Sequence, residues 1–589
     1  MMSKNASHNR CRGKRTWGYS ALCLCVFIVF VLAHLDASSL SNNFQGWNGS
    51  ETLPPKDTIN YIIIRHTDKL YKNYENPRAE ILVGNVKVHH NGADLFCDSA
   101  VYFRETNTCY AFANPGKTVR MIQGDTISLL CRDLRYEGEE MVAYAKGKVE
   151  LRHRNTLLTT DTLNYYRANY IDRTYDSGEF CNGGTLYDNG DTLVADRGFY
   201  VPSTHEAEFT DYNNNVQLFS KDFNLISEKL FYNTQTRRGK IVTPTNINSY
   251  DGTFVYGNRG EYDGATGNAL LTDRSYIING EYRVDGDSLY YNNEDSICEG
   301  FGNVILVDTI SKYKLEGNYC RYERGRGYAM ATDRAVAKEF SDGDTLYVHA
   351  DILEMKTEYS EQGDTLRNFF AYHKVRAYRS DVQAVCDSMV TIMKDSCTYM
   401  YGQPILWSER QQLFGEEIRI YNNDSTIDWI HVIRQAMTIE QLDSASYNQV
   451  AGNEMFSYFS GGELVRNEAH GNVLVAYYME EKDSTRIGFN YTETSKLVVN
   501  MKDRKMSRIW MPKAQGEMYP IGMIPPEKKT LPGFAWFDSI RPKTPDDIFE
   551  WKDKPADKML VKQREHQVPV QQLRRKARQK ESKADGLEY

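Results

Sequence analysis

Apolar and polar residues alternate along most of this chain, and the alternation returns to the same starting pattern at intervals. A Val that opens a predicted strand is followed twelve residues later by an acidic residue. The pairs are Val86 with Asp98, Val149 with Asp161, Val216 with Glu228, Val304 with Glu316, and Val375 with Asp387. A sixth start of the same kind, Gly471-Asn472-Val473, lacks the acid. Such a repeated spacing predicts stacked units that bury their apolar faces against their neighbours.

Between these pairs lie related segments that also close on an acid, at Asp133, Asp196 and Asp351. Taken together, the acids stand about 28 to 36 residues apart. One longer step, from Glu228 to Asp287, indicates a degenerate unit near Gly260-Glu261. Acids that recur once per unit are expected to hold turns or corners rather than to catalyse a reaction.

Each unit shows the two-residue period of a strand with one buried face. The residue just before the acid is small, as in Cys97 and Ala195, and an apolar residue often returns two positions after the acid, as in Ala100 and Leu163. A straight strand cannot place all these positions on one face. The pattern therefore predicts that the chain bends or bulges at the acid, with the small residue inside the corner.

Composition agrees with an all-β protein. The chain has 41 Tyr and 41 Gly but only 16 Pro, and hairpin-turn dipeptides occur at Asn91-Gly92 and Asp263-Gly264. The predicted fold is an elongated repeat array of antiparallel strands over residues 58–505, either continuous or divided into two or three subdomains.

The two ends of the sequence differ from the repeats. Basic residues precede an apolar run from Trp17 to Leu35, so residues 1–38 are predicted to be a signal peptide or a signal anchor, followed by a linker over 39–57. Nine of the prolines lie beyond residue 510, which predicts a Pro-rich closing segment over 506–550. The basic remainder, 551–589, is predicted to be a disordered charged tail.

The sequence offers little catalytic chemistry. It contains no nucleophile elbow, no His-Glu-x-x-His motif and no phosphate-binding loop. Eight Cys follow the export signal; Cys97, Cys131 and Cys386 occupy repeat positions that hold Thr, Ala or Ser in other units, so small buried residues are favoured over disulfides for these three. No Cys-x-x-Cys pair is present, so no zinc site is expected. The prediction is a protein that is not an enzyme, has no cofactor and no metal, and does not bind nucleic acid.

The repeated units resemble a known family. The segments Gly84-Asn85-Val86-Lys87-Val88 to Cys97-Asp98-Ser99-Ala100, and Gly147-Lys148-Val149-Glu150-Leu151 to Thr160-Asp161-Thr162-Leu163, look like those of the OstA and LptA family of lipopolysaccharide export. The resemblance covers roughly residues 58–500. It implies a twisted, partly open β-jellyroll that holds lipid acyl chains in an apolar groove. The chain departs from the family in being several times longer than one LptA-like unit and in lacking room for an outer-membrane barrel after the repeats.

The resemblance also implies a function, a location and partners. It predicts a periplasmic protein, free or associated with either membrane, that binds lipopolysaccharide or lipid A. Such a protein would form part of the bridge between the membranes together with other components of the export machinery, and self-association through sheet edges stays open. The alternatives are an exported scaffold or glycan-binding repeat protein and, third, a carbohydrate-active enzyme. The positions predicted to face the lipid are Val86, Val88, Leu95, Val149, Leu151, Leu158, Leu193, Val216, Leu218, Leu225, Val304, Leu306, Val348 and Val375.

Overall fold

The computed structural model describes residues 60–554 except for 73–75, 169–172, 212, 214, 309–312, 342–343, 362, 364, 424–425, 482–484 and 504. These residues belong to one compact unit, residues 59–589. The predicted export signal, the linker and nearly all of the charged tail lie outside the described residues.

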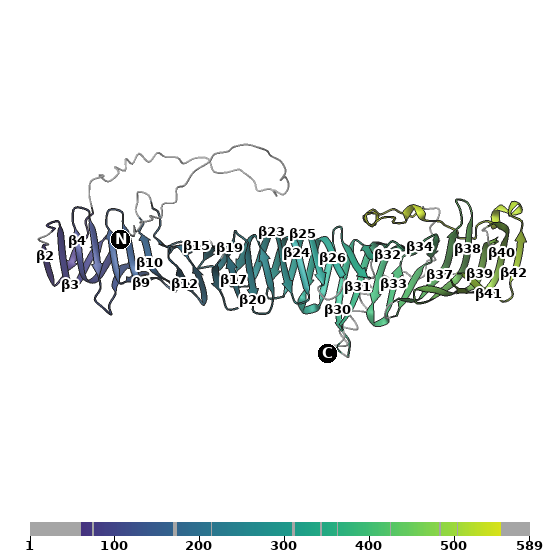
Figure 1. Ribbon diagram of the computed structural model, residues 1–589, viewed down its shortest axis with the longest axis horizontal. Coiled ribbons are helices and arrows are strands. Elements are labelled where there is room, and N and C mark those ends of the chain that lie inside the picture. Colours follow the sequence, from purple (N-terminus) through teal and green to yellow (C-terminus); the bar gives the residue numbers. More distant parts are fainter. Residues whose placement is uncertain are drawn as a thin grey trace, which may run out of the picture. The chain divides into compact units, whose positions relative to one another are not determined.

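The described chain forms one antiparallel sheet of 42 strands, as the period-two pattern predicts, and the strands follow one another in chain order (Figure 1). The helical elements are short 3-10 turns: η1 (Arg324–Arg326), η2 (Met393–Asp395), η3 (Ile521–Met523), η4 (Pro526–Lys528), η5 (Asp538–Ile540) and η6 (Pro545–Phe549). Among the residues described, no helix has the length and apolar character needed to cross a bilayer.

The sheet is folded along its length into two walls that face each other. Fourteen strands bend in the middle and contribute one half to each wall. They are β3 (Ala79–His90), β4 (Ala93–Phe103), β9 (Val142–His153), β10 (Thr156–Tyr166), β23 (Asn268–Asn279), β24 (Tyr282–Asn292), β25 (Ile297–Asp308), β26 (Tyr313–Glu323), β31 (Thr365–Tyr378), β32 (Val382–Ile392), β37 (Ile427–Gln441), β38 (Tyr447–Ser460), β39 (Glu463–Glu480) and β40 (Arg486–Lys502).

The other strands belong to a single wall. Wall 1 contains the half of each long strand that lies on the same side of the bend as Val86–His90 of β3. It also contains β1 (Ile63–His66), β6 (Val119–Gln123), β7 (Ile127–Cys131), β12 (Gly184–Asp188), β13 (Asp191–Ala195), β16 (Val216–Phe219), β17 (Phe223–Ser227), β20 (Thr245–Ser249), β21 (Phe254–Gly257), β28 (Val336–Ser341), β29 (Asp344–His349), β34 (Ile405–Ser408), β35 (Gln411–Phe414) and β42 (Gln515–Tyr519). Wall 2 contains the other halves with β2 (Lys69–Lys72), β5 (Thr108–Phe112), β8 (Asp133–Glu137), β11 (Ser177–Phe180), β14 (Arg197–Val201), β15 (Glu206–Thr210), β18 (Lys229–Asn233), β19 (Arg238–Ile241), β22 (Arg259–Asp263), β27 (Tyr328–Thr332), β30 (Ile352–Tyr359), β33 (Cys397–Tyr401), β36 (Glu417–Asn422) and β41 (Lys505–Trp510).

The bend between the walls is a break in strand register that recurs from strand to strand. In the β3–β4 pair, Val83 lies opposite Ser99 and Val86 opposite Cys97, so two residues of β3 face Asp98 alone. Those two residues, Gly84 and Asn85, have φ of 87° and 46°. Left-handed backbone at this point turns the strand sharply, as in a β-bulge. We call this line of bends the crease, and the opposite edge, where the hairpin turns lie, the seam.

Thirteen single residues form the narrow side of the crease. They are Asp98, Arg132, Asp161, Asp196, Glu228, Asn258, Asp287, Asn318, Asp351, Asp387, Glu416, Asn453 and Ser495. The predicted bend at the acid is thereby confirmed at most of the predicted positions, and the degenerate unit expected near Gly260 has its corner at Asn258. The small residues before the acids lie in the core, as Cys97 and Ala195 do.

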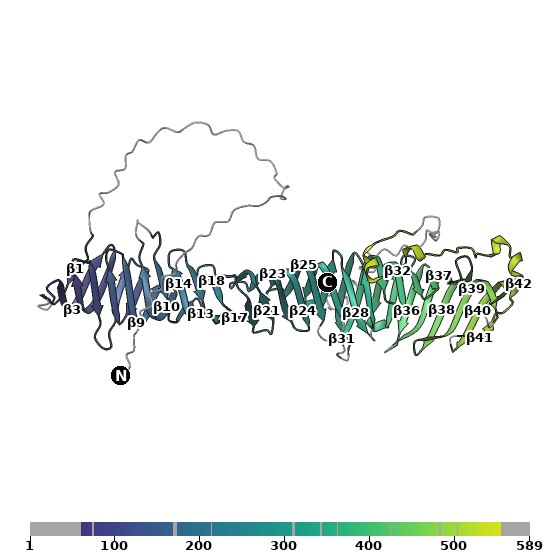
Figure 2. The same cartoon turned by 45° about the horizontal axis from the view of Figure 1, so that its top comes forward.

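Apolar side chains from both walls form one continuous core between them, from Ile62 to Leu497. A second core lies on the outer face of wall 1, from Val385 to Phe489. Residues 520–554, which we call the strap, cover this second core; they run back over the strands from β42 toward β29 (Figures 1 and 2). The predicted Pro-rich closing segment thus comprises β41, β42 and most of the strap.

Buried glutamines of wall 1 hold the strap in place. Gln412 donates to the Ala535 carbonyl at 2.7 Å and accepts the Phe537 amide at 2.8 Å. Gln449 binds the strap in the same two-way fashion, through Lys529 O and Leu531 N, both at 2.8 Å. Each carboxamide satisfies strap backbone groups that would otherwise be buried without partners.

Candidate functional site: the apolar interior

All fourteen positions predicted to face a lipid point between the two walls and are at most 5 % exposed. Their side chains belong to the same continuous core. The sequence left open whether this interior is packed or vacant, and at these positions it is packed.

Further along the chain the interior is less tightly filled. Ten of the thirteen half-buried apolar side chains that pack against the main core lie at or after Leu346. On the inner faces of the strands they include Leu346, Phe369, Leu413, Ile420, Val450, Phe459, Tyr477 and Val499. None of these was predicted, although the same period-two alternation that identified Val375 continues through β36 to β40.

Buried tyrosines explain why the earlier interior is closed. Tyr residues recur every 29 to 35 residues on the inner face of wall 2, each four residues after a narrow corner and each at most 6 % exposed. They are Tyr102, Tyr136, Tyr165, Tyr200, Tyr232, Tyr262, Tyr291 and Tyr322. Because each Tyr lies four residues beyond the crease, its ring lies toward the seam. We call this row the tyrosine ladder.

Several rungs of the ladder bond directly across the seam to wall 1. The Tyr136 hydroxyl lies 2.8 Å from His90 Nδ1 and accepts a hydrogen bond from Arg167 Nη1 at 2.8 Å. Arg167 also donates to the His90 carbonyl at 3.0 Å. Tyr200 repeats the arrangement with His153, at 3.0 Å. These contacts fasten the free edges of the two walls to each other.

A buried carboxylate joins the walls at the next rung. Asp191 of wall 1 is 2 % exposed and accepts the Tyr232 hydroxyl at 2.7 Å. Arg237 donates to it twice, through Nε at 3.0 Å and Nη2 at 2.8 Å. Ser220 Oγ completes its partners at 2.7 Å. A buried charge with this many donors is satisfied, and losing it would leave Arg237 unpaired.

Among the other rungs, Tyr165 donates to Gln123 Oε1 of wall 1 at 3.4 Å, and two rungs pack their rings across the seam. Tyr262 packs on Phe223 of wall 1 with ring centroids 4.4 Å apart, and Tyr322 packs on Tyr282 at 4.6 Å. Beyond Tyr322, Arg367 of wall 2 still crosses the seam, pairing through Nε with Asp308 at 2.7 Å and through Nη2 with Glu281, in the turn between β23 and β24, at 2.9 Å.

Burial governs the protonation of the seam. Desolvation raises the pKa of all eight ladder tyrosines, that of Tyr102 to about 12, so each hydroxyl keeps its proton as a donor. Desolvation also lowers the pKa of His90 and His153, which favours neutral imidazoles there.

The ladder ends after Tyr322. At the following corners the fourth residue is Met355, Thr391, Ile420, Ser457 and Val499. We therefore divide the array into a latched segment, β3–β26 (Ala79–Glu323), and an open segment, β28–β40 (Val336–Lys502). The half-buried inner residues from Leu346 to Val499 all belong to the open segment.

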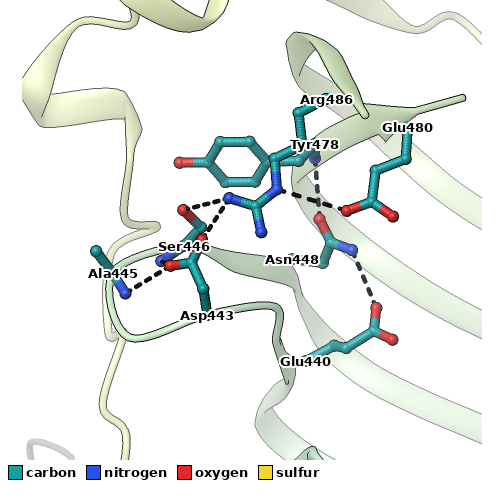
Figure 3. Close-up of polar contacts among 8 residues, drawn as sticks. All are labelled: Glu440, Asp443, Ala445, Ser446, Asn448, Tyr478, Glu480 and Arg486. Atoms are coloured by element: carbon teal, nitrogen blue, oxygen red, sulfur yellow. Dashed lines mark hydrogen bonds and ion pairs between the residues drawn. The ribbon is translucent and has the colours of Figure 1, made fainter. Parts of the chain in front are cut away.

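In the open segment one cluster of polar contacts near the seam runs along wall 1. Figure 3 shows Arg486, at the start of β40, donating to Asp443 and to Ser446 Oγ (3.0 Å) in the turn between β37 and β38. Backbone amides of that turn and Arg486 lower the pKa of Asp443 to about 2. All of these groups belong to hairpins of wall 1, so the cluster ties neighbouring units together without joining the walls.

Six of the eight predicted repeat acids lie on the outside of the crease. Asp98 accepts the Asn114 amide at 2.9 Å and Lys117 Nζ at 2.8 Å, and these donors lower its pKa. Asp161, Asp196, Asp351 and Asp387 are exposed corner residues, and Glu228 is a half-buried one.

Two of the predicted acids are not at corners. Asp133 pairs regularly with Lys146, and Glu316 with Ile305. Arg132 and Asn318 occupy those corners instead. The number of residues between the Val and the corner differs between units, because the wide side of the crease and the turns differ in length. The fixed step of twelve residues therefore reaches Glu316 instead of the corner at Asn318, and the looser match reaches Asp133 instead of the corner at Arg132.

Other groups with chemical potential have structural surroundings. All described cysteines except Cys181 are buried, and these seven are free thiols; desolvation raises the pKa of the Cys97 thiol to about 12. The residues described contain no cluster of three or more metal-ligating side chains.

Both ends of the array expose apolar side chains. On β1 and β2, Ile63 and Leu70 are 46 % and 50 % exposed; on β41, Ile509 and Trp510 are 48 % and 49 % exposed. The terminal repeats of stacked arrays ordinarily carry polar outer faces. The described end strands present edges with these apolar side chains beside exposed Lys69, Lys72, Lys505 and Arg508.

Comparison with known proteins agrees with this architecture. Residues 59–228 match the family model of OstA-like proteins, a range that contains the first five narrow corners and the first four rungs of the tyrosine ladder. No curated protein matches the sequence. Over residues 59–228 the chain is therefore similar to OstA-like proteins.

Proposed function

We propose that this chain is a non-catalytic, periplasmic lipid-handling protein of lipopolysaccharide export, which holds acyl chains between its two walls and forms part of the bridge between the membranes. The observation that carries the proposal is the apolar core that continues without a break from Ile62 to Leu497. Each methylene of an acyl chain removed from water gains about 0.8 kcal/mol. A lipid with several acyl chains is therefore retained wherever the walls admit it.

The ends of the array support a place within a larger assembly. Edge strands with unpaired backbone groups and exposed apolar side chains pair readily with another strand. A neighbour with the same folded sheet, either a component of the export machinery or a second copy, would continue both walls and the apolar interior.

Lipid capture tests the proposal. The full chain is expressed with a photoreactive residue at inner positions of both segments or at the outward-facing Lys87 or Glu150, irradiated in cells and analysed by mass spectrometry. We expect lipopolysaccharide or its lipid part on at least one set of inner positions and none at the outward ones. Equal labelling of both faces, or none on either, would move the assignment to the alternative function.

That alternative is an exported scaffold or glycan-binding repeat protein with no lipid transport. The packing of the latched segment favours it, because twelve of the fourteen predicted inner positions lie there and, at no more than 5 % exposed, leave no vacant space for a ligand at those positions. The open segment favours lipid handling.

A further inference from the structure

We propose that the acyl-chain site of this protein is the interior of the open segment, β28–β40, and that the tyrosine ladder excludes lipid from the latched segment until its cross-wall bonds break. The inference rests on the proposed function and assigns a place to its ligand. Its starting point is the contrast between the two segments, which share one fold and one continuous core.

The inner face of the open segment has the chemistry of an acyl-chain site. Phe369, Leu413, Ile420, Val450, Phe459 and Val499 are half-buried and carry no polar side-chain atoms. A saccharide or a peptide needs hydrogen-bond partners, which these side chains do not supply. A hydrocarbon chain needs apolar contacts alone, so the surface fits the lipid part of the cargo.

The two segments also differ in the bonds that cross the seam. In the latched segment, Tyr136, Tyr200 and Tyr232 bond across to wall 1. In the open segment the equivalent positions are Met355, Thr391, Ile420, Ser457 and Val499. None of these side chains carries the phenol ring that bonds across the seam in the latched segment. Beyond the ion pairs of Arg367, a lipid can therefore enter the open segment from the side without first breaking a bond of the tyrosine ladder.

The strap is a further difference between the latched and the open segment. It covers the outer face of wall 1 only beside the open segment, from the β29–β31 region to β42. Wall 1 there packs on both faces, against the strap and against the main core. This second core holds the wall in place without the ladder, so the interior can stay partly unfilled while the fold persists.

Photocrosslinking to purified lipid A tests the inference. Photoreactive residues are placed at Phe369 and Val450 in the open segment, at Leu151 and Leu218 in the latched segment, and at the outward-facing Arg419 as a control. We expect at least about tenfold stronger labelling at the two open positions than at the two latched ones. Equal labelling in both segments would overturn the inference and leave the proposed function standing, whereas labelling of none of the inner positions would overturn the proposed function itself.

Extending the ladder provides the converse test. The double variant Thr391→Tyr, Ile420→Tyr places tyrosines at the next equivalent positions and should lower labelling at Phe369 and Val450 to the level of Leu151. The matched control, Val390→Tyr, adds a tyrosine to the opposite face of the same strand and should leave labelling unchanged. If the double variant fails to fold, Tyr200→Phe with Tyr232→Phe gives the reverse experiment, which should raise labelling at Leu218. Unchanged labelling in the folded variant used would contradict the role of the ladder.

Discussion

At the scale of single residues, the seam depends on a few buried polar groups. One of them is Asp191, which accepts hydrogen bonds from Tyr232, Arg237 and Ser220 at a site that is 2 % exposed. Breaking a buried ion pair by removing one partner typically costs 3–5 kcal/mol, since it leaves the other charge uncompensated.

We expect Asp191→Ala to lower the free energy of unfolding by about 3–5 kcal/mol, measured by urea denaturation. The control is Asp196→Ala, at an exposed corner five residues away, which should change it by less than about 0.5 kcal/mol. Similar losses in both variants would show that corner and seam acids contribute alike, contrary to the structure.

The seam histidines predict a pH dependence. His90 and His153 have pKa values lowered by desolvation, so in acid the unfolded chain binds protons that the folded chain resists. The stability that the two neutral histidines contribute to the folded state is complete above their unfolded pKa of about 6.5, and it is lost as the pH falls below that value toward their folded pKa values. The melting temperature should decrease between pH 7.5 and 5.5, and the double variant His90→Gln, His153→Gln should show a smaller decrease. A pH profile identical in both proteins would exclude these histidines as the cause.

At the scale of strands and segments, the two parts of the interior should respond differently to an inserted charge. Leu193, in the latched segment, is fully buried, and Leu193→Asp would bury an unpaired carboxylate. We expect a loss of at least about 3 kcal/mol there. Ile420→Asp lies on the half-exposed inner face of β36, where the carboxylate keeps part of its hydration, and should leave a folded protein by circular dichroism. Equal damage in both variants would show that the open segment is as closed as the latched one.

The strap makes a prediction about local stability. Gln412→Ala removes the partners of Ala535 O, Phe537 N and Trp407 Nε1, all buried. Each unsatisfied group costs about 1–3 kcal/mol, so amide exchange over residues 531–540 should accelerate by at least tenfold in hydrogen–deuterium exchange. The exposed neighbour Gln411 provides the control variant, Gln411→Ala, and protection that persists in Gln412→Ala would show that apolar packing alone holds the strap.

At the scale of the whole molecule, the exposed apolar side chains at the two ends of the described array predict association. Ile509→Lys and Leu70→Lys each place a charge on an exposed apolar end, and a charged edge strand disfavours pairing with another strand. Both variants should weaken end-to-end crosslinking of the purified chain, or its capture of an export component, by about tenfold or more. Lys505→Ala, on the same terminal strand as Ile509, is the matched control. Association that survives both end variants would place the interface elsewhere.

Sequence predicted the architecture better than the site. The alternation and the corner acids identified the sheet, its bends and the inward face of Val86 or Leu193, because these follow from local chain geometry. It missed the corners at Arg132 and Asn318, where the polar residue at the bend is not an acid. The tyrosine ladder was visible in principle, since each ring stands four residues after a corner, but only once the corners are known.

The strap could not be predicted in the same way. Its residues show no period-two or helical alternation, and Phe537 or Ile540 becomes a core residue only because wall 1 exposes a second apolar face there. Contacts between Gln412 and Phe537 span more than a hundred residues of sequence. Which segment is open and which is latched is a property of these distant contacts rather than of any local pattern.

The regular alternation of wide and narrow corners has a consequence for how such chains change in length. Because each unit passes from one narrow corner to the next and adds two strands to each wall, a duplicated unit fits into the middle of the array without altering either terminal edge. Every such duplication lengthens the stack by a step of about 10 Å. A protein built in this manner can be matched to the distance it must cover by the gain or loss of whole units, while the surfaces at its two ends stay the same.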